Sequence, residues 1–260
     1  TGIACAASHN KATATLNSVK FPYTVTDDDG NKVQAEITGL GAEARCMNCH
    51  QGRASKSSVD DLIARFKVED VDAVVAPITD DQGNTVSFGF VNVHYYAAAA
   101  TLYGTEVKGG YEYEGKMYDA KHDHVEGYDT CIGCHNSHSL ELKVEACVVC
   151  HGEDANTVEG LRAIREVSSM MDYDGDGDVE EGMYFEIVGL QEKLYAAINE
   201  YATTVAGKGI VYDPAAHPYF FADADGDGAV DQNAEGASVR YDVFTARLMK
   251  AAYNYQVSLK

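Results

Sequence analysis

The sequence from residue 131 to residue 151 reads Cys131-Ile-Gly-Cys134-His135-Asn-Ser-His138-Ser-Leu-Glu-Leu-Lys-Val-Glu-Ala-Cys147-Val-Val-Cys150-His151. It holds the pattern C-x-x-C-H twice, and the pattern also occurs earlier as Cys46-Met-Asn-Cys49-His50. This spacing attaches c-type haem, because two thiols add to one porphyrin and the adjacent imidazole becomes an axial ligand of its iron. Zinc ribbons and redox-active C-x-x-C pairs are alternatives, but neither requires a histidine after the second cysteine. The sequence therefore predicts three covalently bound haems.

The chain has seven cysteines, so one lies outside these three motifs. It belongs to the segment Cys5-Ala-Ala-Ser8-His9, which has the same frame with serine in place of the second cysteine. One thioether and the imidazole of His9 would still hold a haem, because iron ligation does not depend on the second thioether. A free thiol, an intermolecular disulfide and a lipid-modified cysteine are the alternatives. We therefore expect a fourth haem at Cys5 and His9.

The remaining histidines are candidates for the distal side of the haems. His138 follows His135 by three residues, which is too close for the opposite face of the same haem, so we expect it to reach another haem, such as that of Cys147 and Cys150. Methionine is the alternative distal ligand and would raise the potential, but no methionine is suitably placed relative to the motifs. We therefore predict bis-histidine ligation. His122 and His124 are only two residues apart, so they should not both face one haem, and His217 is the weakest candidate. The candidate distal ligands are His94, His122, His124, His138 and His217.

Acidic residues dominate the charge of the chain. With 20 Lys and Arg against 41 Asp and Glu, the formal net charge is −21, which disfavours binding to nucleic acid or to an anionic membrane. No apolar run approaches the roughly 20 residues that span a bilayer. Residues 1–10 lack the basic start and apolar stretch of a secretory signal, so we expect any such signal to have been removed.

Two acidic segments in the second half resemble calcium-binding loops. In each, acidic side chains alternate, a glycine takes the sharp turn and a hydrophobic residue follows. Position twelve of each loop carries Met183 or Ala234 instead of the usual glutamate, so other carboxylates must replace it. A flexible acidic surface turn is the alternative. The predicted ligands are Asp172, Asp174, Asp176, Asp178 and Glu181 in the first loop, and Asp223, Asp225, Asp227 and Asp231 in the second.

The chain divides at residue 152 in its sequence pattern. Residues 1–152 hold every cysteine, and two similar turns, near residues 26–33 and 79–86, predict short β-hairpins. We expect helices over 59–66, capped by Ser57 or Ser58, and in the alanine-rich stretch 92–103.

Residues 153–260 are predicted to form helices over about 158–171, 183–205 and 239–257. The fold class is therefore mainly α with extensive loops and short hairpins: a haem-cored half beside a small helical half held together by calcium. The middle helix has an apolar stripe that we expect to be core, formed by Met183, Ile187, Leu190, Leu194, Ile198, Tyr201 and Val205.

At its three motifs the chain resembles multihaem c-type cytochromes. The segments Asn92-Val-His94-Tyr-Tyr-Ala-Ala-Ala-Ala and Lys108-Gly-Gly-Tyr-Glu-Tyr are similar to secreted members from anaerobic, metal-respiring prokaryotes. The resemblance covers about the first 60% of the chain. It implies electron transfer outside the cell or at its surface, with the periplasm as the alternative location. It also implies partners that are other redox proteins or copies of the chain in a filament.

Two other functions stay open from the sequence. A multihaem reductase of nitrogen or sulfur oxyanions would need one haem with an open coordination position, and the surplus of distal candidates argues against this. A structural subunit stabilised by calcium is the third interpretation. An electron carrier that is not an enzyme is the prediction.

Overall fold

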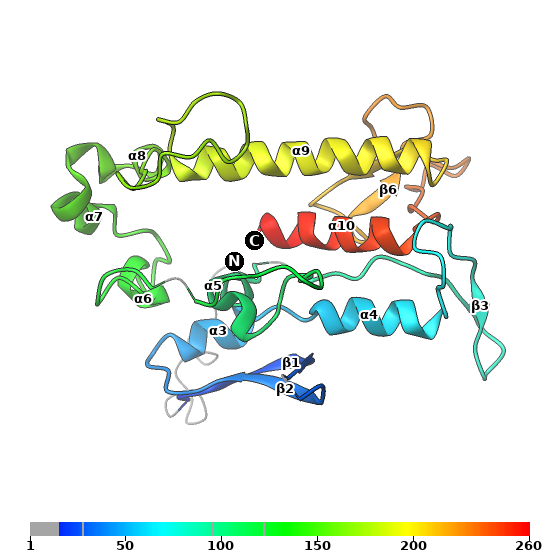
Figure 1. The fold of residues 1–260 in the computed structure, drawn as a ribbon, viewed down its shortest axis with the longest axis horizontal. Coiled ribbons are helices and arrows are strands. Elements are labelled where there is room, and N and C mark those ends of the chain that lie inside the picture. Colours follow the sequence, from blue (N-terminus) through cyan, green and yellow to red (C-terminus); the bar gives the residue numbers. More distant parts are fainter. Residues whose placement is uncertain (1–15, 28, 95, 122) are drawn as a thin grey trace.

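The computed structural model describes residues 16–27, 29–94, 96–121 and 123–260. Cys5, His9 and His122, three of the predicted haem residues, lie outside these ranges. Figure 1 shows four successive layers: the hairpin of β1 (Val19–Thr26) and β2 (Lys32–Ile37), then α4 (Lys56–Arg65), α10 (Ala246–Ser258) and α9 (Met183–Thr204).

The three haem-attachment motifs lie together at one end of this stack (Figure 1). They are carried by α3 (Ala44–His50), α6 (Cys131–Cys134) and α7 (Val144–His151). Helix α5 (Ala98–Tyr103) packs against α3. Two short 3-10 segments, η1 (Gly104–Glu106) and η2 (Glu153–Asn156), follow α5 and α7. The structure thus gathers at one end motifs that are up to 101 residues apart, since the first begins at Cys46 and the third at Cys147.

Both predicted hairpins of the first region are present. In the β1–β2 hairpin the Asp27 carboxylate accepts the backbone N–H of Asn31 at 2.7 Å. In the hairpin of β3 (Ile78–Thr79) and β4 (Thr85–Val86), Asp80 accepts the N–H of Asn84 at 2.8 Å. The two turns repeat in structure as they do in sequence, because the aspartate side chain replaces a backbone acceptor in each. Alternate residues of β1 are buried, which packs this hairpin on α4 and α3.

Two helices of the first region differ from their predicted bounds. Helix α4 begins at Lys56, three residues before the prediction, and its cap is Ser55 rather than Ser57 or Ser58: the Ser55 N–H donates to the Ser58 hydroxyl at 3.1 Å. The predicted helix over 92–103 begins only at Ala98. His94 has a φ of +80°, outside the helical region, so it lies before the helix and not within it.

The predicted helix over 158–171 is wrong beyond its first five residues. Helix α8 covers only Val158–Arg162. In the loop that follows, the Arg165 guanidinium donates to the backbone carbonyls of Ser169, at 2.6 Å, and of Met171 and Glu181. These carbonyls are therefore satisfied by a side chain, and the segment has no need of a helical ladder.

The last predicted helix is also too long at its start. Residues 239–241 lie beside β6 (Phe220–Ala222), which pairs with β5 (Ile210–Tyr212), and the Ala222 N–H donates to the Val239 carbonyl at 2.8 Å. Helix α10 begins after Thr245, whose hydroxyl accepts the Leu248 N–H at 3.1 Å. Helix α9 covers Met183–Thr204, which confirms the prediction over 183–205 to within one residue.

The hydrophobic core crosses the predicted boundary at residue 152. The Tyr253 hydroxyl of α10 donates to the Gly109 carbonyl at 2.6 Å, and the Val93 N–H donates to Gln256 at 3.0 Å. Phe90 packs on Phe220 with ring centres 4.7 Å apart. The C-terminal helix thus completes the core of the first region, and the division at 152 remains a prediction from sequence pattern.

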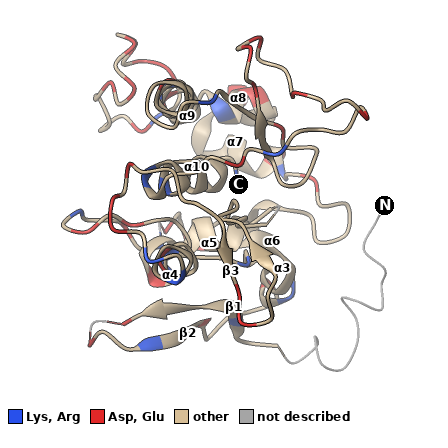
Figure 2. Cartoon of the chain, turned by 90° about the vertical axis from the view of Figure 1, so that its right-hand side faces the viewer, with Lys and Arg blue, Asp and Glu red and all other residues tan. Residues whose placement is uncertain are grey.

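The apolar stripe of α9 is core only in part. Ile198 is buried, whereas Ile187 is 49% and Leu190 46% exposed. The prediction that the whole stripe is buried is wrong, because α10 and the loops cover only the second half of this long helix. None of the helices in the described ranges combines the length and the apolar character needed to cross a membrane. Acidic residues line the loops at the edges of the molecule, as Figure 2 shows.

Candidate haem centre and acidic loops

Each attachment motif is on or at the end of a short helix. In α3, Cys46, Cys49 and His50 are three and four residues apart, so their side chains share one face. The motif on α7 repeats this arrangement. Helix α6 ends at Cys134 and His135 is extended, so the second motif turns its imidazole away from the helix axis. The first turn of α6 is fixed by Thr130, whose hydroxyl accepts the Gly133 N–H at 3.1 Å.

The six cysteines that the structure describes are free thiols. Burial raises the pKa of Cys46, Cys131 and Cys134 above the usual value of a thiol. Cys46 and Cys131 line the same cavity, and Lys143, at the start of α7, donates its backbone N–H to the Cys134 carbonyl at 2.9 Å, so successive motifs are neighbours. The three attachment sites therefore follow one another in space in the order of the sequence.

A cavity of about 760 Å³ lies between the first and the second motif. This size is within the ~300–1,000 Å³ of typical cofactor sites. Both imidazoles, His50 and His135, line it. The rest of the lining is largely apolar and includes Met47, Ala99, Leu102, Ile132 and Leu140. Thiols, imidazoles and apolar walls at one cavity are the donor set and the surroundings that c-type haem requires.

Two backbone carbonyls orient these imidazoles. The Nδ1 atom of His50 lies 2.8 Å from the Tyr96 carbonyl oxygen, and that of His135 lies 3.0 Å from the Leu140 carbonyl oxygen. A carbonyl only accepts, so each Nδ1 carries the proton and each Nε2 keeps its lone pair for a metal. Tyr96 and Leu140 both have positive φ, +50° and +65°. Sequence reasoning missed them because they act through the backbone, which a side-chain motif does not reveal.

The third motif has a different neighbour. His151 lies beside His124, with ring centres 6.0 Å apart and planes inclined by 26°. His124 also lines the cavity. The structure therefore brings one of the predicted distal histidines to a predicted proximal histidine.

The other described distal candidates lie elsewhere. The N–H of His138 donates to the Asn136 side chain at 2.9 Å, on the exposed loop after α6, and His94 precedes α5. Neither lines the cavity. His217 packs edge-on against Tyr219, 5.8 Å between ring centres, in the β5–β6 hairpin at the opposite end of the molecule from α7 (Figure 1). His217 is therefore not placed to serve the three motifs of its own chain.

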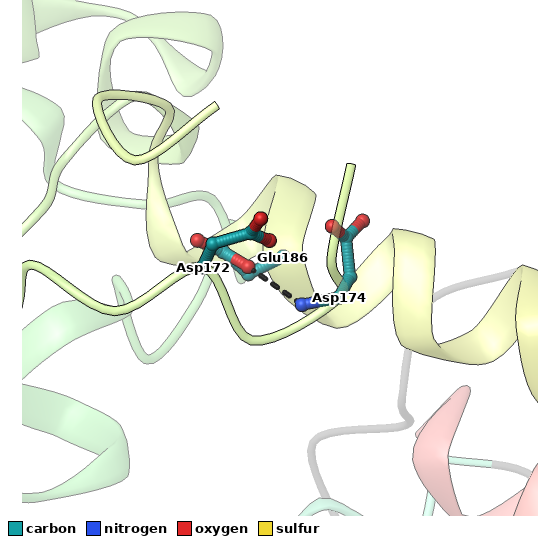
Figure 3. Close-up of side chains that lie close together, drawn as sticks. All are labelled: Asp172, Asp174 and Glu186. Atoms are coloured by element: carbon teal, nitrogen blue, oxygen red, sulfur yellow. Dashed lines mark hydrogen bonds between the residues drawn. The ribbon is translucent and has the colours of Figure 1, made fainter. Parts of the chain in front are cut away.

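The first acidic loop is tied to α9 by a residue that sequence reasoning missed. Oxygens of Asp172, Asp174 and Glu186 lie within 4.8 Å of one another (Figure 3). Glu186, buried on α9, accepts the N–H groups of Tyr173 at 2.7 Å and Asp174 at 3.0 Å, and pairs with Arg165 at 2.6 Å. It lies beyond the twelve positions of the calcium-loop pattern, so the pattern does not reach it.

The predicted ligand Glu181 forms a second group with Asp174 and Asp176. Its Oε1 is buried without a hydrogen-bond partner in the described chain. Burial, and then the negative charges of Asp176 and Asp174, raise the pKa of Glu181 above its usual value. Asp178 accepts the N–H groups of Glu180 and Glu181 instead and shapes the loop. A cation between these carboxylates would relieve the repulsion and satisfy the free oxygen.

The second acidic loop brings together Asp223, Asp225 and Asp227 within the same 4.8 Å. Asp223 is only 8% exposed, and its Oδ1 has no hydrogen-bond partner among the residues described. Asp231 is not part of this group: its carboxylate accepts the Ala224 N–H at 2.9 Å and closes the loop. The loop thus offers three carboxylates, one of them buried and incompletely satisfied.

Comparison with known proteins identifies relatives of the chain. It is 30% identical to the C-type polyheme cytochrome OmcB of Geobacter sulfurreducens over 265 aligned positions, which cover 91% of this chain and 29% of the relative. It is 30% identical to the C-type polyheme cytochrome OmcC of the same organism over 251 positions, 85% of this chain and 26% of the relative. The chain thus spans less than a third of the length of these relatives. No family model and no solved structure matches it.

Proposed function

This chain is a relative of the polyheme c-type cytochromes, as its motifs predict, and we propose from that premise that it binds haem c at three motifs and carries electrons between them. The observation that carries the proposal is the apolar cavity that two motifs share, with both imidazoles on its wall. Since the chain covers under a third of its relatives, only electron transfer by haem is taken from them.

Different residues would attach each haem, bind its iron and orient the ligands. The paired thiols of each motif would form the thioethers, and Nε2 of His50 and of His135 would bind the iron. The carbonyls of Tyr96 and Leu140 hold the two rings in one orientation and increase their basicity. Haem c, when bound, supplies a one-electron redox centre. The apolar wall around it excludes water, which sets the potential together with the ligands.

The order of the attachment sites supports transfer along the chain. The first and second motifs share a cavity, and the start of α7 is hydrogen-bonded to Cys134 of α6, so the second site lies between the first and the third. Electrons would pass in this order or its reverse. The relatives are named as cytochromes, which carry electrons, and the chain is accordingly an electron carrier and not an enzyme.

Intact mass spectrometry and redox titration test this function together. The protein, produced in cells that attach c-type haem, should carry three haem masses from the described motifs and a fourth if Cys5 and His9 hold one. Every haem should be reduced and reoxidised reversibly. Replacing both cysteines of one motif by alanine should remove one haem mass. A chain that carries no covalent haem, or whose haems do not cycle, would overturn the proposal.

We also propose that the two acidic loops bind Ca²⁺. Carboxylate oxygens are the ligands this ion prefers, and the buried, unpartnered oxygens of Glu181 and Asp223 support a bound cation. The proposed ligands of the first loop are Asp172, Asp174, Asp176 and Glu181, drawn from the two carboxylate groups that share Asp174, and those of the second are Asp223, Asp225 and Asp227. Isothermal titration with Ca²⁺ after chelation should show two equivalents per chain. A titration that shows neither a heat of binding nor saturation would overturn the proposal that the loops bind Ca²⁺.

An extracellular or cell-surface location, with the periplasm as alternative, is our proposal for where the protein works. Loops that lack the position-twelve glutamate bind Ca²⁺ weakly, which suits the higher calcium outside cells. We propose as partners other redox proteins or copies of the chain joined into a polymer. Negative-stain microscopy at high concentration tests the polymer: filaments would support it, and discrete monomers alone would overturn it.

A further inference from the structure

We propose that His124 and His151 are the two axial ligands of one haem, the haem attached at Cys147 and Cys150. This assignment rests on the proposed function and gives one haem a complete set of ligands from this chain. It also replaces our prediction that His138 serves the haem of Cys147 and Cys150.

The geometry of the two rings fits a shared metal ion. An imidazole bound through a metal–nitrogen bond of ~2 Å has its ring centre roughly 3 Å from the metal, so two such rings on opposite sides lie roughly 6 Å apart. The observed separation of the His124 and His151 ring centres is 6.0 Å. Their planes, inclined by 26°, are close to parallel. The separation is that of two rings that bind one ion from opposite sides, and the near-parallel planes are compatible with this arrangement.

The ring separation alone does not distinguish two ligands of one metal from two rings in direct contact, because aromatic side chains in contact also have centres ~4.5–7 Å apart. The hydrogen bonds supply the second observation. In the described chain none of the four ring nitrogens of His124 and His151 has a hydrogen-bond partner, whereas His50 and His135 each use one nitrogen on a carbonyl. Both rings are exposed. Two exposed rings gain little from contact with each other, but each offers a donor nitrogen to a metal.

The loop that carries His124 is fixed on both sides of this residue. Lys121, which is largely buried, pairs with Asp123 at 3.0 Å and with Asp129 at 3.6 Å, so one ammonium group closes the segment around His124. Gly133 of α6 packs directly on the backbone of Gly127, since a Cβ atom at Gly133 would overlap the Gly127 carbonyl oxygen, and this contact joins the loop to the second motif. The position of His124 is therefore set by the protein before any haem ligand forms.

The position of α7, which carries His151, is fixed relative to the same motif. Lys143, at the start of α7, donates its backbone N–H to the Cys134 carbonyl at 2.9 Å and its ammonium group to the Ile132 carbonyl at 2.6 Å. His124 and His151 are thus both attached to α6 and its neighbours. Two ligands held by one rigid junction give a haem that is six-coordinate, passes electrons and has no open position for a substrate.

The experiment compares His124→Ala with His138→Ala in the haem-loaded protein. In His124→Ala, one haem per chain should change from low-spin to high-spin in the electron paramagnetic resonance spectrum, and the reduced protein should bind one equivalent of carbon monoxide. The haem count by intact mass should stay the same. His138→Ala should show no change at the haem of Cys147 and Cys150.

A second background identifies the haem concerned. In the variant Cys147→Ala/Cys150→Ala, which lacks that haem, His124→Ala should add no high-spin signal. If it does add one, His124 serves another haem and the proposal is overturned. An unchanged spectrum of His124→Ala also overturns it.

If His124→Ala loses haem or misfolds, His124→Met tests whether residue 124 is a haem ligand. A thioether at this position should restore a low-spin haem and raise the potential of that one haem, which only a ligand can do. A His124→Met protein whose potentials all match the wild type would overturn the proposal. Failure of the proposed function can be distinguished from failure of this assignment, because in the former case the wild-type protein would carry no haem mass at all.

Discussion

The Nδ1 atom of His50 lies 2.8 Å from the backbone carbonyl oxygen of Tyr96, a residue with a φ of +50°. The unusual backbone conformation is what points this carbonyl at the imidazole. A conformation that L-residues rarely adopt costs free energy, so it persists only where the surrounding structure enforces it. The same combination recurs at His135 and Leu140.

We predict that Tyr96→Pro raises the potential of one haem. Proline fixes φ near −65°, so the carbonyl turns away and His50 loses its hydrogen bond. The loss of a bond worth about 1 kcal/mol corresponds to roughly 40 mV for one electron. Spectroelectrochemical titration measures the shift. Tyr96→Gly is the matched control, because glycine adopts positive φ freely and should keep the wild-type potential. Equal potentials in the two variants would contradict the role of the carbonyl.

We predict that Gly189→Ala removes the calcium site of the first loop. A Cβ atom at Gly189 of α9 would overlap the Asp174 carboxylate, which is one of the proposed ligands. The carboxylate must then move away from the other ligands. Calcium titration should find one equivalent instead of two. Gly110→Ala is the control, since its Cβ would lie 3.8 Å from the nearest atom and leave both sites intact. Two equivalents in Gly189→Ala would show that Asp174 does not bind the ion.

We predict that Asp223→Asn weakens the second site by at least about 10–100-fold, because losing even a residue that only supports a metal ligand costs that much affinity. The change removes the charge of the buried, unpartnered oxygen. At 100 times its dissociation constant an ion stabilises the fold by about 2.7 kcal/mol, which raises Tm by roughly 5–10 °C for a chain of this size. Differential scanning calorimetry with calcium and with chelator measures this increment. The control is Asp242→Asn, which changes an exposed carboxylate paired with Lys208 and should leave the calcium-induced rise in Tm unchanged. If Asp223→Asn shows the same rise in Tm as the wild type, the site is contradicted.

The sequence predicted those parts of the fold whose cause is local. The C-x-x-C-H motifs, the two hairpins closed by Asp27 and Asp80, and the long helix α9 each follow from neighbouring residues. The early end of α8 and the late start of α10 do not follow from neighbouring residues. Arg165 through its side chain, and strand β6 from a distant part of the sequence, satisfy the backbone groups there instead.

The candidate site shows the same division between local and distant causes. The proximal ligands are local, whereas the approach of His124 to His151 and the binding of Glu186 to the first loop depend on tertiary packing. The carbonyls of Tyr96 and Leu140 have no sequence signal, since any residue has a carbonyl.

We predict that acid weakens the junction of α9 and α10 through Asp72. Hydrogen bonds from Arg247, at 2.5 and 3.0 Å, and then from the Tyr201 hydroxyl at 2.7 Å lower the pKa of Asp72 to about 2. The folded state thus binds the proton less readily than the unfolded chain. The stabilisation is complete above pH ~4, where the unfolded carboxyl is ionised, and is lost as the pH falls towards 2.

Asp72→Asn tests this contribution. The variant should unfold at a lower temperature than the wild type at pH 7, by a few degrees at most since the pair is partly exposed. The difference should shrink between pH 4 and pH 2, because the wild-type carboxyl then loses its own charge. Thermal unfolding at pH 7, 4 and 2, with Asp242→Asn as the exposed control, measures it. A difference in Tm that stays constant across this range would mean that Asp72 stabilises the junction without its charge.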